Sequence, residues 1–334
     1  MNHTKIIEYK EGDKYEDIYL LKSCSLKETK TGKTYLDAEL SDASGTLSVK
    51  LWNVTSKDEN LVVGGFVKAK ISISSFNDQL QGTIDTIEPV SIDEIAIEDL
   101  NDLIPTAPIK AEVMYDYLLE TARGFKNDDL RKVVEKILEE EKEGLFHTAG
   151  AKKVHHAVVN GLLLHTSYML RSAKAICEVY NPGYFGIERF SLYPNLDVEL
   201  VMAGVILHDI GKIEEFDTNE FGLVNEYSTE GSLMGHLFIG AYKVKQACAE
   251  LGLGKELTNN LVHIILSHHG KPEFGAVAVP QTIEAKLVNY IDEMDAHLNV
   301  YAGAVEGLEE GTFSERNFAA GTRIYKHGDL KNED

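Results

Sequence analysis

Histidine and aspartate recur from residue 165 onward at positions where the neighbouring residues are apolar. The members of this set are His165, His208, Asp209, His236, His268, His269 and Asp292. Each lies within or beside an apolar segment with helical spacing, so each side chain is expected to face the interior. A buried ionisable group is costly unless it is paired, hydrogen-bonded or bound to a metal. Imidazole nitrogen and carboxylate oxygen together suit divalent first-row metals such as Mn, Fe, Co or Zn. We therefore predict a buried metal centre.

The segment LHDIGK places His208 directly before Asp209 at the end of the apolar run AGVIL. Lys212 follows one helical turn after His208, where it could orient Asp209 or neutralise the phosphate of a substrate. The alternative is a surface lysine at a helix end, which is common. Asp295 falls on the same helix face as Asp292. It is a candidate for supporting a ligand, with helix capping or exposure to solvent as alternatives.

Helical periodicity begins at Ile109 and predicts the elements that position these side chains. The first helical segments are AEVMYDYLLETARGF and DDLRKVVEKILEEEKEGLF, and further helices run to about residue 308, with breaks at NPGYFG and SLYPN. The preceding segment, SIDEIAIEDLNDLIPTAPIK, is acidic, contains two prolines and lacks alternation, which is typical of a linker that leads into a helix.

The region from Asp17 to about Val90 alternates between apolar and polar residues, as do strands with one buried face and one face exposed to solvent. In YLDAELSD, Leu36, Ala38 and Leu40 share one face. The runs TLSVKLW and GGFVKAKISIS repeat the pattern, and YLLKSCSLKE and LQGTIDTIE complete about five short strands. Closing five strands into a barrel buries one face of each strand and removes the exposed edges.

Residues 15 to 90 thus resemble an OB-fold of the kind appended to nucleic-acid enzymes. On its outer face aromatic rings could stack on bases while lysines follow the phosphates. The candidate nucleic-acid-binding residues are Tyr35, Lys50, Trp52, Lys68, Lys70 and Phe76. The competing interpretation is that they form the wetted outside of a barrel, because Asp37 and Glu39 share that face.

The composition limits the classes of partner. The 334 residues include 54 acidic and 33 basic side chains, for a formal net charge of −21. This charge argues against a purely electrostatic nucleic-acid binder and favours a local basic patch or bound cations. The three cysteines form no CxxC pair. No apolar run is long enough to span a bilayer, and the N-terminal segment lacks the apolar stretch of a signal peptide. We expect a cytoplasmic protein with no membrane partner.

The ordered pattern H…HD…H…HH…D resembles the HD superfamily of metal-dependent phosphohydrolases. The resemblance implies that His165, His208, Asp209 and Asp292 hold a first metal. It further implies that His236 and either His268 or His269, with His268 preferred, hold a second metal that Asp209 bridges to the first. Two divalent ions can clamp a phosphate and activate the attacking water. Manganese is expected first, with Fe, Co, Zn and Mg as alternatives.

A barrel followed by IPTAP, AKKVHHAVVNGLLLHT, LHDIGK, ILSHHG, NYIDEMDAHLN and FSERNFAAGTRIYK closely resembles the YhaM-type 3′-5′ exoribonucleases of Gram-positive bacteria. The resemblance implies that the barrel binds single-stranded nucleic acid and that the HD domain removes nucleotides from the 3′ end. Asp209, Lys212 and His156 are then the catalytic candidates, with His155 beside His156 in the HHA run. Leu164 and Asn160 depart from the family pattern, which often has an acidic residue and commonly a glycine at these two positions.

These observations predict a two-domain protein: a small OB-fold β-barrel followed by an all-α HD-superfamily domain. The expected boundaries are 1–92 for the barrel, 93–108 for the linker, 109–320 for the HD domain and 321–334 for a C-terminal tail. The expected partner is single-stranded RNA, with single-stranded DNA and a homo-oligomer left open. The first alternative is an HD phosphohydrolase for a small nucleotide or cyclic dinucleotide. A non-catalytic RNA-binding scaffold and a purely structural helical protein leave the buried histidines without a purpose.

Overall fold

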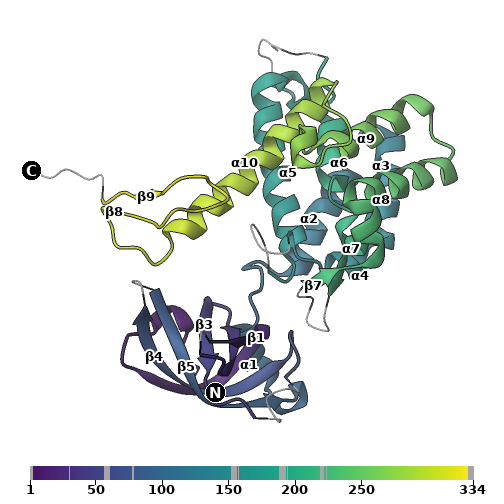
Figure 1. Ribbon diagram of the computed structural model, residues 1–334. Helices are drawn as coiled ribbons and strands as arrows, with labels where there is room; N and C mark the ends of the chain where they lie inside the picture. The colour runs from purple at the N-terminus through teal and green to yellow at the C-terminus, as the bar shows by residue number, and fades with distance from the viewer. Residues whose placement is uncertain are drawn as a thin grey trace, which may run out of the picture. The chain divides into compact units, whose positions relative to one another are not determined.

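In the computed structural model the chain divides into two compact units, Met1–Thr106 and Ala107–Asp334 (Figure 1). The structure describes residues 3–29, 31–55, 61–76, 79–151, 156, 158–187, 193, 195–218, 222 and 224–329. The predicted fold class is confirmed: a closed five-stranded barrel is followed by a helical unit. No described helix is both long enough and apolar enough to cross a bilayer.

The barrel closes in the strand order β1-β2-β3-β5-β4, with β4 returning to β1. Its strands are β1 (Lys14–Glu28), β2 (Thr34–Ser41), β3 (Thr46–Leu51), β4 (Phe66–Phe76) and β5 (Gln79–Val90). All the neighbouring pairs are antiparallel except β3 and β5, which run parallel. A short 3₁₀ turn, η1 (Ile6–Glu8), precedes β1.

Alternation places the predicted apolar faces inside the barrel. Leu36, Ala38 and Leu40 of β2 and Leu47 and Val49 of β3 are all buried, and they pack in one cluster with the inward residues of β1, β4 and β5. Because the strand period is two, a shift of one residue would expose this entire set. The burial pattern therefore fixes which side chains remain outside.

The predicted linker contains structure of its own. A 3₁₀ turn, η3 (Ile92–Glu94), and a short helix, α1 (Ile97–Leu103), follow β5, and α1 contacts β1. Ile95 and Leu103 are buried, and the amide of Ala43 donates to the carbonyl of Asp102. This part of the chain is thus packed against the barrel.

His3 bridges two buried carboxylates of the barrel. Its Nδ1 lies 2.9 Å from Asp17 Oδ2 and its Nε2 lies 2.9 Å from Asp42 Oδ2. Asp42 also accepts hydrogen bonds from the amides of Ile6 and Gly45. The hydrogen bonds to Asp17 and Asp42 raise the pKa of His3 to about 9. A protonated imidazole thus ties the N-terminal segment to β1 and to the turn after β2.

We expect His3→Ala to lower the free energy of unfolding of the barrel by about 2 kcal/mol at pH 6, the usual size of a hydrogen bond to a charged group. The folded pKa lies above the unfolded value, so this stabilisation is complete below pH 6.5 and disappears as the pH rises through about 9. Urea unfolding followed by the fluorescence of Trp52, the single tryptophan, reports on the barrel. A difference between variant and wild type that stays constant from pH 6 to 10 would contradict this role.

The second unit is a bundle of helices with two small hairpins. Its helices are α2 (Ala111–Arg123), α3 (Asp128–Glu140), α4 (Lys142–Leu145), α5 (Gly161–Tyr180), α6 (Val198–Leu207), α7 (Lys212–Glu215), α8 (Thr229–Glu250), α9 (Lys255–Ser267) and α10 (Ile283–Val305). The 3₁₀ turns are η4 (Pro182–Phe185) and η5 (Pro272–Phe274). The hairpins pair β6 (Phe216–Thr218) with β7 (Val224–Tyr227) and β8 (Thr312–Phe313) with β9 (Tyr325–Lys326).

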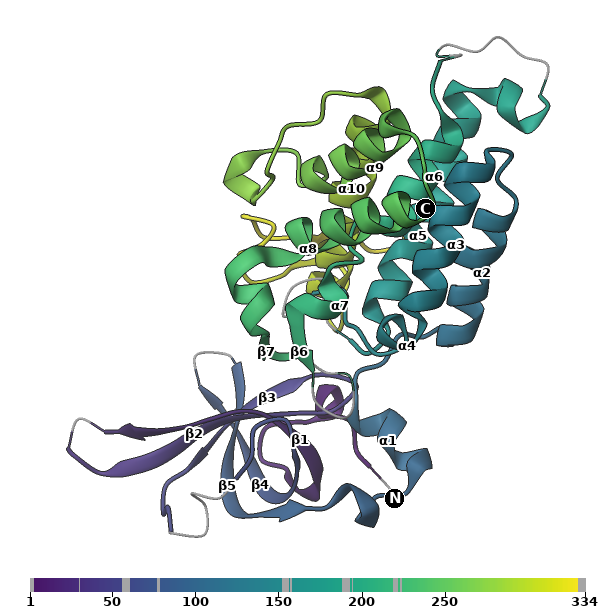
Figure 2. The same cartoon turned by 90° about the vertical axis from the view of Figure 1, so that its right-hand side faces the viewer.

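Helix α6 lies in the centre of this unit and contacts α3, α5, α9 and α10 (Figure 2). Apart from Glu199 its residues are apolar, and nearly all are buried, as expected of a central helix. Asp197 caps its N-terminus by accepting from the amide of Leu200. Helices α2 and α3 are amphipathic and cover the outer side with one apolar face each. The buried end of α6 therefore lies deep in the unit.

Candidate metal centre

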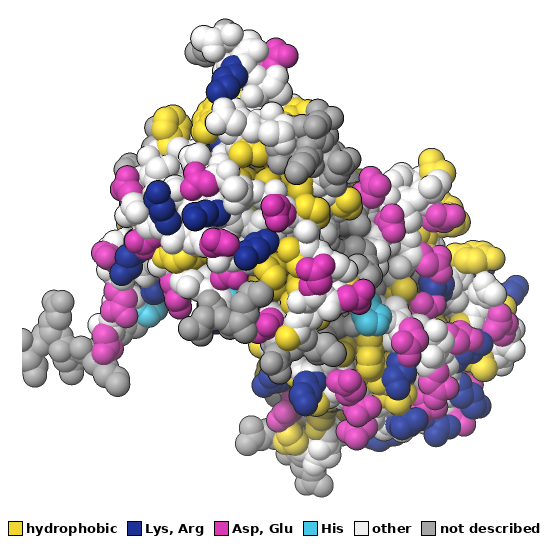
Figure 3. Space-filling view, turned by 90° about the horizontal axis from the view of Figure 1, so that it is seen from below, with side chains coloured by type: hydrophobic (Ala, Val, Ile, Leu, Met, Phe, Trp, Pro, Cys, Tyr) yellow, Lys and Arg dark blue, Asp and Glu magenta, His cyan; other side chains and the backbone are white. Residues whose placement is uncertain are grey.

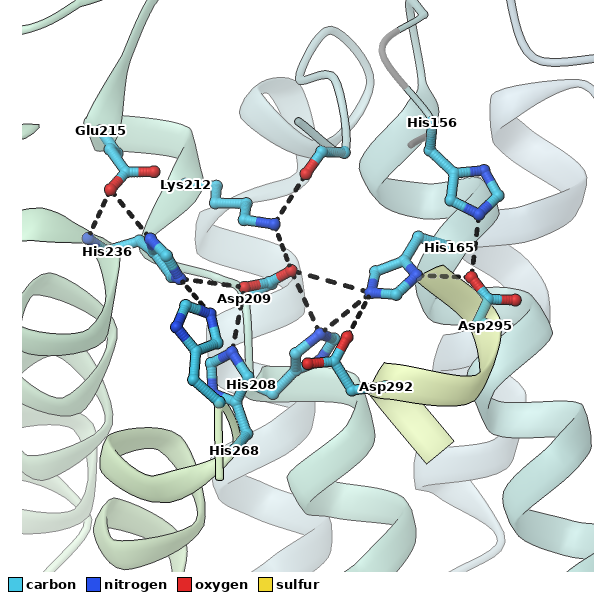
Figure 4. A network of polar contacts seen from close by, with 12 residues as sticks. His156, His165, His208, Asp209, Lys212, Glu215, His236, His268, Asp292 and Asp295 are labelled. Atoms are coloured by element: carbon cyan, nitrogen blue, oxygen red, sulfur yellow. Dashed lines mark hydrogen bonds and ion pairs between the residues drawn. The ribbon is translucent and has the colours of Figure 1, made fainter. Parts of the chain in front are cut away.

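Seven side chains that the sequence singles out come together from five helices (Figure 4). His165 is the fifth residue of α5, His208 and Asp209 follow the last residue of α6, and His236 lies in α8. His268 and His269 follow α9, and Asp292 lies in α10. Packing of α5, α6, α9 and α10 against one another thus assembles the predicted centre.

The turn after α6 is shaped by a close approach between backbones. A Cβ atom at Gly211 would lie 2.2 Å from the carbonyl oxygen of His236 and 2.6 Å from the amide nitrogen of Gly240. Only glycine fits at such a contact. The glycine of LHDIGK therefore lets α7 pack on α8 and brings Asp209 and His236 into the same site.

A break in α8 aims the His236 side chain. Gly235 has φ 71° and ψ 157°, a conformation that is essentially restricted to glycine, and it interrupts the helix directly before His236. Glu215 Oε1 accepts from both the backbone amide of His236, at 2.9 Å, and its ring Nδ1, at 2.8 Å. The carboxylate thus fixes the position and the orientation of the imidazole together.

Each of the five histidines has its Nδ1 engaged by a protein oxygen. The acceptors are the carbonyls of Val205 for His208, Ile265 for His268 and Phe274 for His269, and the carboxylates of Glu215 for His236 and Asp295 for His165. Carbonyl oxygens and ionised carboxylates only accept, so each Nδ1 carries the proton. The five Nε2 atoms are therefore the ones directed at the centre, which is the arrangement of metal-binding histidines.

Asp209 lies between two groups of these nitrogen atoms. Its Oδ2 is 3.1 Å from His208 Nε2, and its Oδ1 is 3.4 Å from His236 Nε2 and 3.5 Å from His268 Nε2. Ligand atoms of His165, His208 and Asp292 lie within 4.8 Å of one another, and so do those of His236, His268 and His269. The aspartate thus offers one oxygen to each group.

The donor set fits metal ions better than it fits a purely protein network. His236 Nε2 and His269 Nε2 are 3.3 Å apart, and both rings carry their proton on Nδ1. Two lone pairs at this distance repel unless a cation lies between them. Among the described residues, the buried Asp209 Oδ1 and His268 Nε2 have no hydrogen-bond partner. Such orphaned acceptors are costly in an interior, and a divalent cation would satisfy them together.

The two groups differ in charge. Burial lowers the pKa of His268, and burial together with His268 and His236 lowers the pKa of His269 to about 4. At His165 burial is outweighed by the hydrogen bonds with Asp292 and Asp295, which raise the pKa to about 9. Burial opposes ionisation of Asp209, but Lys212 and His208 hold the pKa of its carboxyl well below the usual range. The aspartate is therefore ionised at neutral pH.

Lys212 is buried, so the alternative of a surface lysine is wrong. Its Nζ donates to Asp209 Oδ2 at 2.6 Å and to the carbonyl of Gly150 at 2.7 Å. Burial disfavours its charge, but the neighbouring Asp209 outweighs that effect and raises the pKa of Lys212. The lysine thus holds the aspartate in place and balances its charge.

His156 and Asp295 are not among the seven candidate ligands but lie on the Nδ1 side of His165. Asp295 Oδ2 accepts from His165 Nδ1 at 2.7 Å and contacts His156 Nε2 at 2.8 Å. The side chain of His156 is buried and is not part of the cavity wall, whereas Asp295 takes the supporting position that its spacing from Asp292 allowed. His155 lies outside the described residues.

A cavity of about 520 Å³ opens onto the centre, a volume typical of small-molecule sites. Its lining includes Asp209, Lys212, Glu215, His236, His268, His269 and Asp292. Phe274, Tyr227 and His297 also line it, together with Ala319 from the C-terminal hairpin. The cavity thus combines charged and aromatic lining residues, while His165 and His208 lie behind its surface.

The six predicted nucleic-acid-binding residues of the barrel do not form one continuous surface group. Tyr35 and Trp52 lie against each other, with ring centroids 5.0 Å apart, and Lys50 Nζ is 5.9 Å from the centroid of the Trp52 ring. Lys68 and Lys70 lie on β4, where both pair with Glu16. Phe76 is exposed at the end of β4. Tyr35, Lys50 and Trp52 therefore form the one compact aromatic and basic group of the six.

The helical unit also matches a known family model. The model described as "HD domain" matches residues 162–297, which include all seven residues of the centre. Over 316 residues the chain is 33% identical to the 3′-5′ exoribonuclease YhaM of Bacillus subtilis (strain 168), covering 94% of this chain and 95% of that protein. The chain belongs to the YhaM family of 3′-5′ exoribonucleases. The predicted family and the prediction that the protein is an enzyme are thus confirmed.

A second YhaM family member, from Geobacillus sp. (strain WCH70), is 32% identical over 322 residues and is covered over 94% of its length. Among solved structures, the second OB-fold domain of replication protein A from Methanococcus maripaludis matches with a TM-score of 0.22 and 16% identity. That match covers 28% of this chain and 97% of that one. The YhaM matches span both the barrel and the helical unit.

Sequence reasoning did not single out Glu215 or the approach of Ala319 to the cavity. Glu215 meets His236 only through the packing of α7 on α8, and no spacing along the chain connects the two. Gly235 had a usable signal, since an isolated glycine beside a candidate ligand in a helical pattern marks an altered backbone.

Proposed function

We propose that this protein removes nucleotides from the 3′ end of single-stranded RNA by metal-dependent hydrolysis, with release of nucleoside monophosphates. The observation that carries the proposal is the convergence of five histidine Nε2 atoms with the carboxylates of Asp209 and Asp292, at a site where His236, His268, His269 and both aspartates line one cavity. Membership of the YhaM family supports the direction of attack and the polymer substrate.

In this proposal His165, His208, Asp209 and Asp292 hold a first divalent ion. His236 and His268, with His269 beside them, hold a second, and Asp209 bridges the two. When bound, divalent ions of this kind supply positive charge for the phosphate oxygens and lower the pKa of the attacking water. Manganese is the proposed metal, with Fe, Co, Zn and Mg as alternatives. Glu215 and Asp295 orient two of the ligand rings, and Lys212 keeps Asp209 ionised and in position.

The surface charge bears on how such a protein could hold RNA. On the face shown in Figure 3, acidic and basic side chains are interspersed and do not form one broad basic area. Binding is then local: Tyr35 and Trp52 can stack on bases while Lys50 contacts phosphate. We include Lys68, Lys70 and Phe76 in the proposed surface, although the two lysines must give up Glu16 to contact RNA.

The deciding experiment follows an RNA of about 20 nucleotides, labelled at its 5′ end, with manganese and with chelator. A dinucleotide and a single-stranded DNA of the same sequence are tested alongside. The proposal predicts a manganese-dependent ladder that shortens from the 3′ end. If the dinucleotide were hydrolysed while the RNA stayed intact, the small-nucleotide phosphohydrolase would replace the exoribonuclease. DNA shortening at a comparable rate would extend the substrate class to both polymers.

A further inference from the structure

The C-terminal segment 311–326 forms a closed hairpin that lies outside both the barrel and the matched HD domain. Beyond the pairing of β8 with β9, the amide of Ser314 donates to the carbonyl of Ile324, and Asn317 forms a bridge with Thr322. Asn317 Oδ1 accepts from the amide of Ala320, and Gly321 supplies the positive φ of 68° that the turn needs. The tip therefore has a defined conformation.

This tip reaches the cavity of the metal centre. Figure 1 shows the segment between β8 and β9 running back toward α10, and Ala319 at its tip forms part of the cavity wall. The preceding residue, Phe318, is 99% exposed. A single exposed aromatic residue needs no explanation by itself. Here, however, it is held on an ordered turn and directly precedes Ala319, a residue that lines the cavity.

The hairpin is basic in an acidic protein. Between Gly311 and Lys326 the positive residues are Arg316, Arg323 and Lys326 and the negative one is Glu315, so three minus one gives a net charge of +2 against −21 for the chain. The guanidinium of Arg323 lies 5.1 Å from the centroid of the Phe313 ring. Arg316 donates to the carbonyl of Gly321 and Arg323 to the carbonyl of Ser314, and both side chains are exposed. Neither guanidinium has a carboxylate partner among the described residues, so its charge is open to an anion.

We propose that this hairpin holds the RNA strand just upstream of the phosphodiester being cleaved. Phe318 stacks on a base, while Arg316 and Arg323 contact phosphates, which is the pairing of aromatic and basic groups that binds single strands without sequence preference. The inference rests on the proposed exoribonuclease function. It gives the RNA a second contact region in addition to the barrel, and this second region lies next to the cavity.

The test measures the affinity of the full-length, manganese-loaded protein for a 5′-fluorescein RNA of about 20 nucleotides. The last linkages of this RNA are phosphorothioates, so that it resists cleavage, and binding is followed by fluorescence anisotropy. Phe318→Ala is expected to raise Kd about tenfold, the usual effect of losing one stacked base, and Phe318→Trp to restore it. Arg316→Ala should reduce the slope of log Kd against log salt by about 0.7, the value for one phosphate of a single strand. Tyr242→Ala, an exposed aromatic on α8 outside the cavity, is the matched control.

Three results would overturn the inference: an unchanged Kd in Phe318→Ala, equal losses in Phe318→Ala and Tyr242→Ala, or no measurable RNA binding by the wild type. Sedimentation of wild type and Phe318→Ala tests whether the tip binds a second copy of the chain instead of RNA. A smaller assembly in the variant would show that it does, and would also overturn the inference. Shortening of unmodified RNA is measured separately. If the wild type binds RNA through Phe318 and does not shorten it, the proposed function fails and the hairpin site stands.

Discussion

Asp209→Asn is expected to lower the rate of RNA shortening by about 10³-fold or more. Asp209 offers one carboxylate oxygen to each group of histidines, so the substitution weakens both proposed ion sites at once. The positive charge that stabilises the transition state of phosphate hydrolysis is worth several kcal/mol, and each 1.36 kcal/mol is a factor of ten in rate. Rates with excess manganese and the metal content of the purified variant are the two measurements.

The substitution also leaves the buried Lys212 without its negative partner, so a loss of stability has to be separated from a loss of chemistry. Thermal unfolding of the variant provides that separation. Asp217→Asn, at an exposed carboxylate on β6, is the matched control and should keep the wild-type rate. An Asp209→Asn protein that is folded, contains both ions and shortens RNA at the wild-type rate would refute the bridging role.

Glu215→Ala is expected to weaken manganese binding by 10- to 100-fold, the usual effect of removing a residue that orients a ligand. Without this carboxylate, His236 loses the acceptor for its Nδ1 and for its backbone amide, and the ring is free to turn or to change tautomer. The dependence of the RNA-shortening rate on manganese concentration measures the effect. The half-saturating concentration should rise more than the maximal rate falls.

Glu215→Gln separates geometry from charge, because its amide oxygen can still accept from His236 although it carries no negative charge. Its effect should be smaller than that of alanine. Glu214→Ala removes the neighbouring carboxylate, which is half-exposed and pairs with Lys243, and serves as the control. Equal effects of Glu214→Ala and Glu215→Ala would show that the segment tolerates no change, rather than that His236 needs its acceptor.

The parts of this protein that were predictable are those with a local signature. Alternation in YLDAELSD and TLSVKLW determined which barrel side chains point inward, and LHDIGK marked His208 and Asp209 by adjacency in an apolar run. The pairing of Lys68 and Lys70 with Glu16 was not predictable, because it depends on the register between β4 and β1. Glu215 escaped for the same reason, since its partner is reached only through the packing of α7 on α8.

His165 and Asp292 are supported differently from His236 and His269. His165 and Asp292 project from within α5 and α10, whereas His236 follows the break at Gly235 and His269 lies beyond the end of α9. Helix interiors are among the last parts of a fold to open, and helix ends and breaks are among the first. Of the two ions that we propose, the one held by His236 should therefore leave before the one held by His165. Activity would then depend on the concentration of free metal in two steps. The separation between these two steps would depend on the helix break at Gly235.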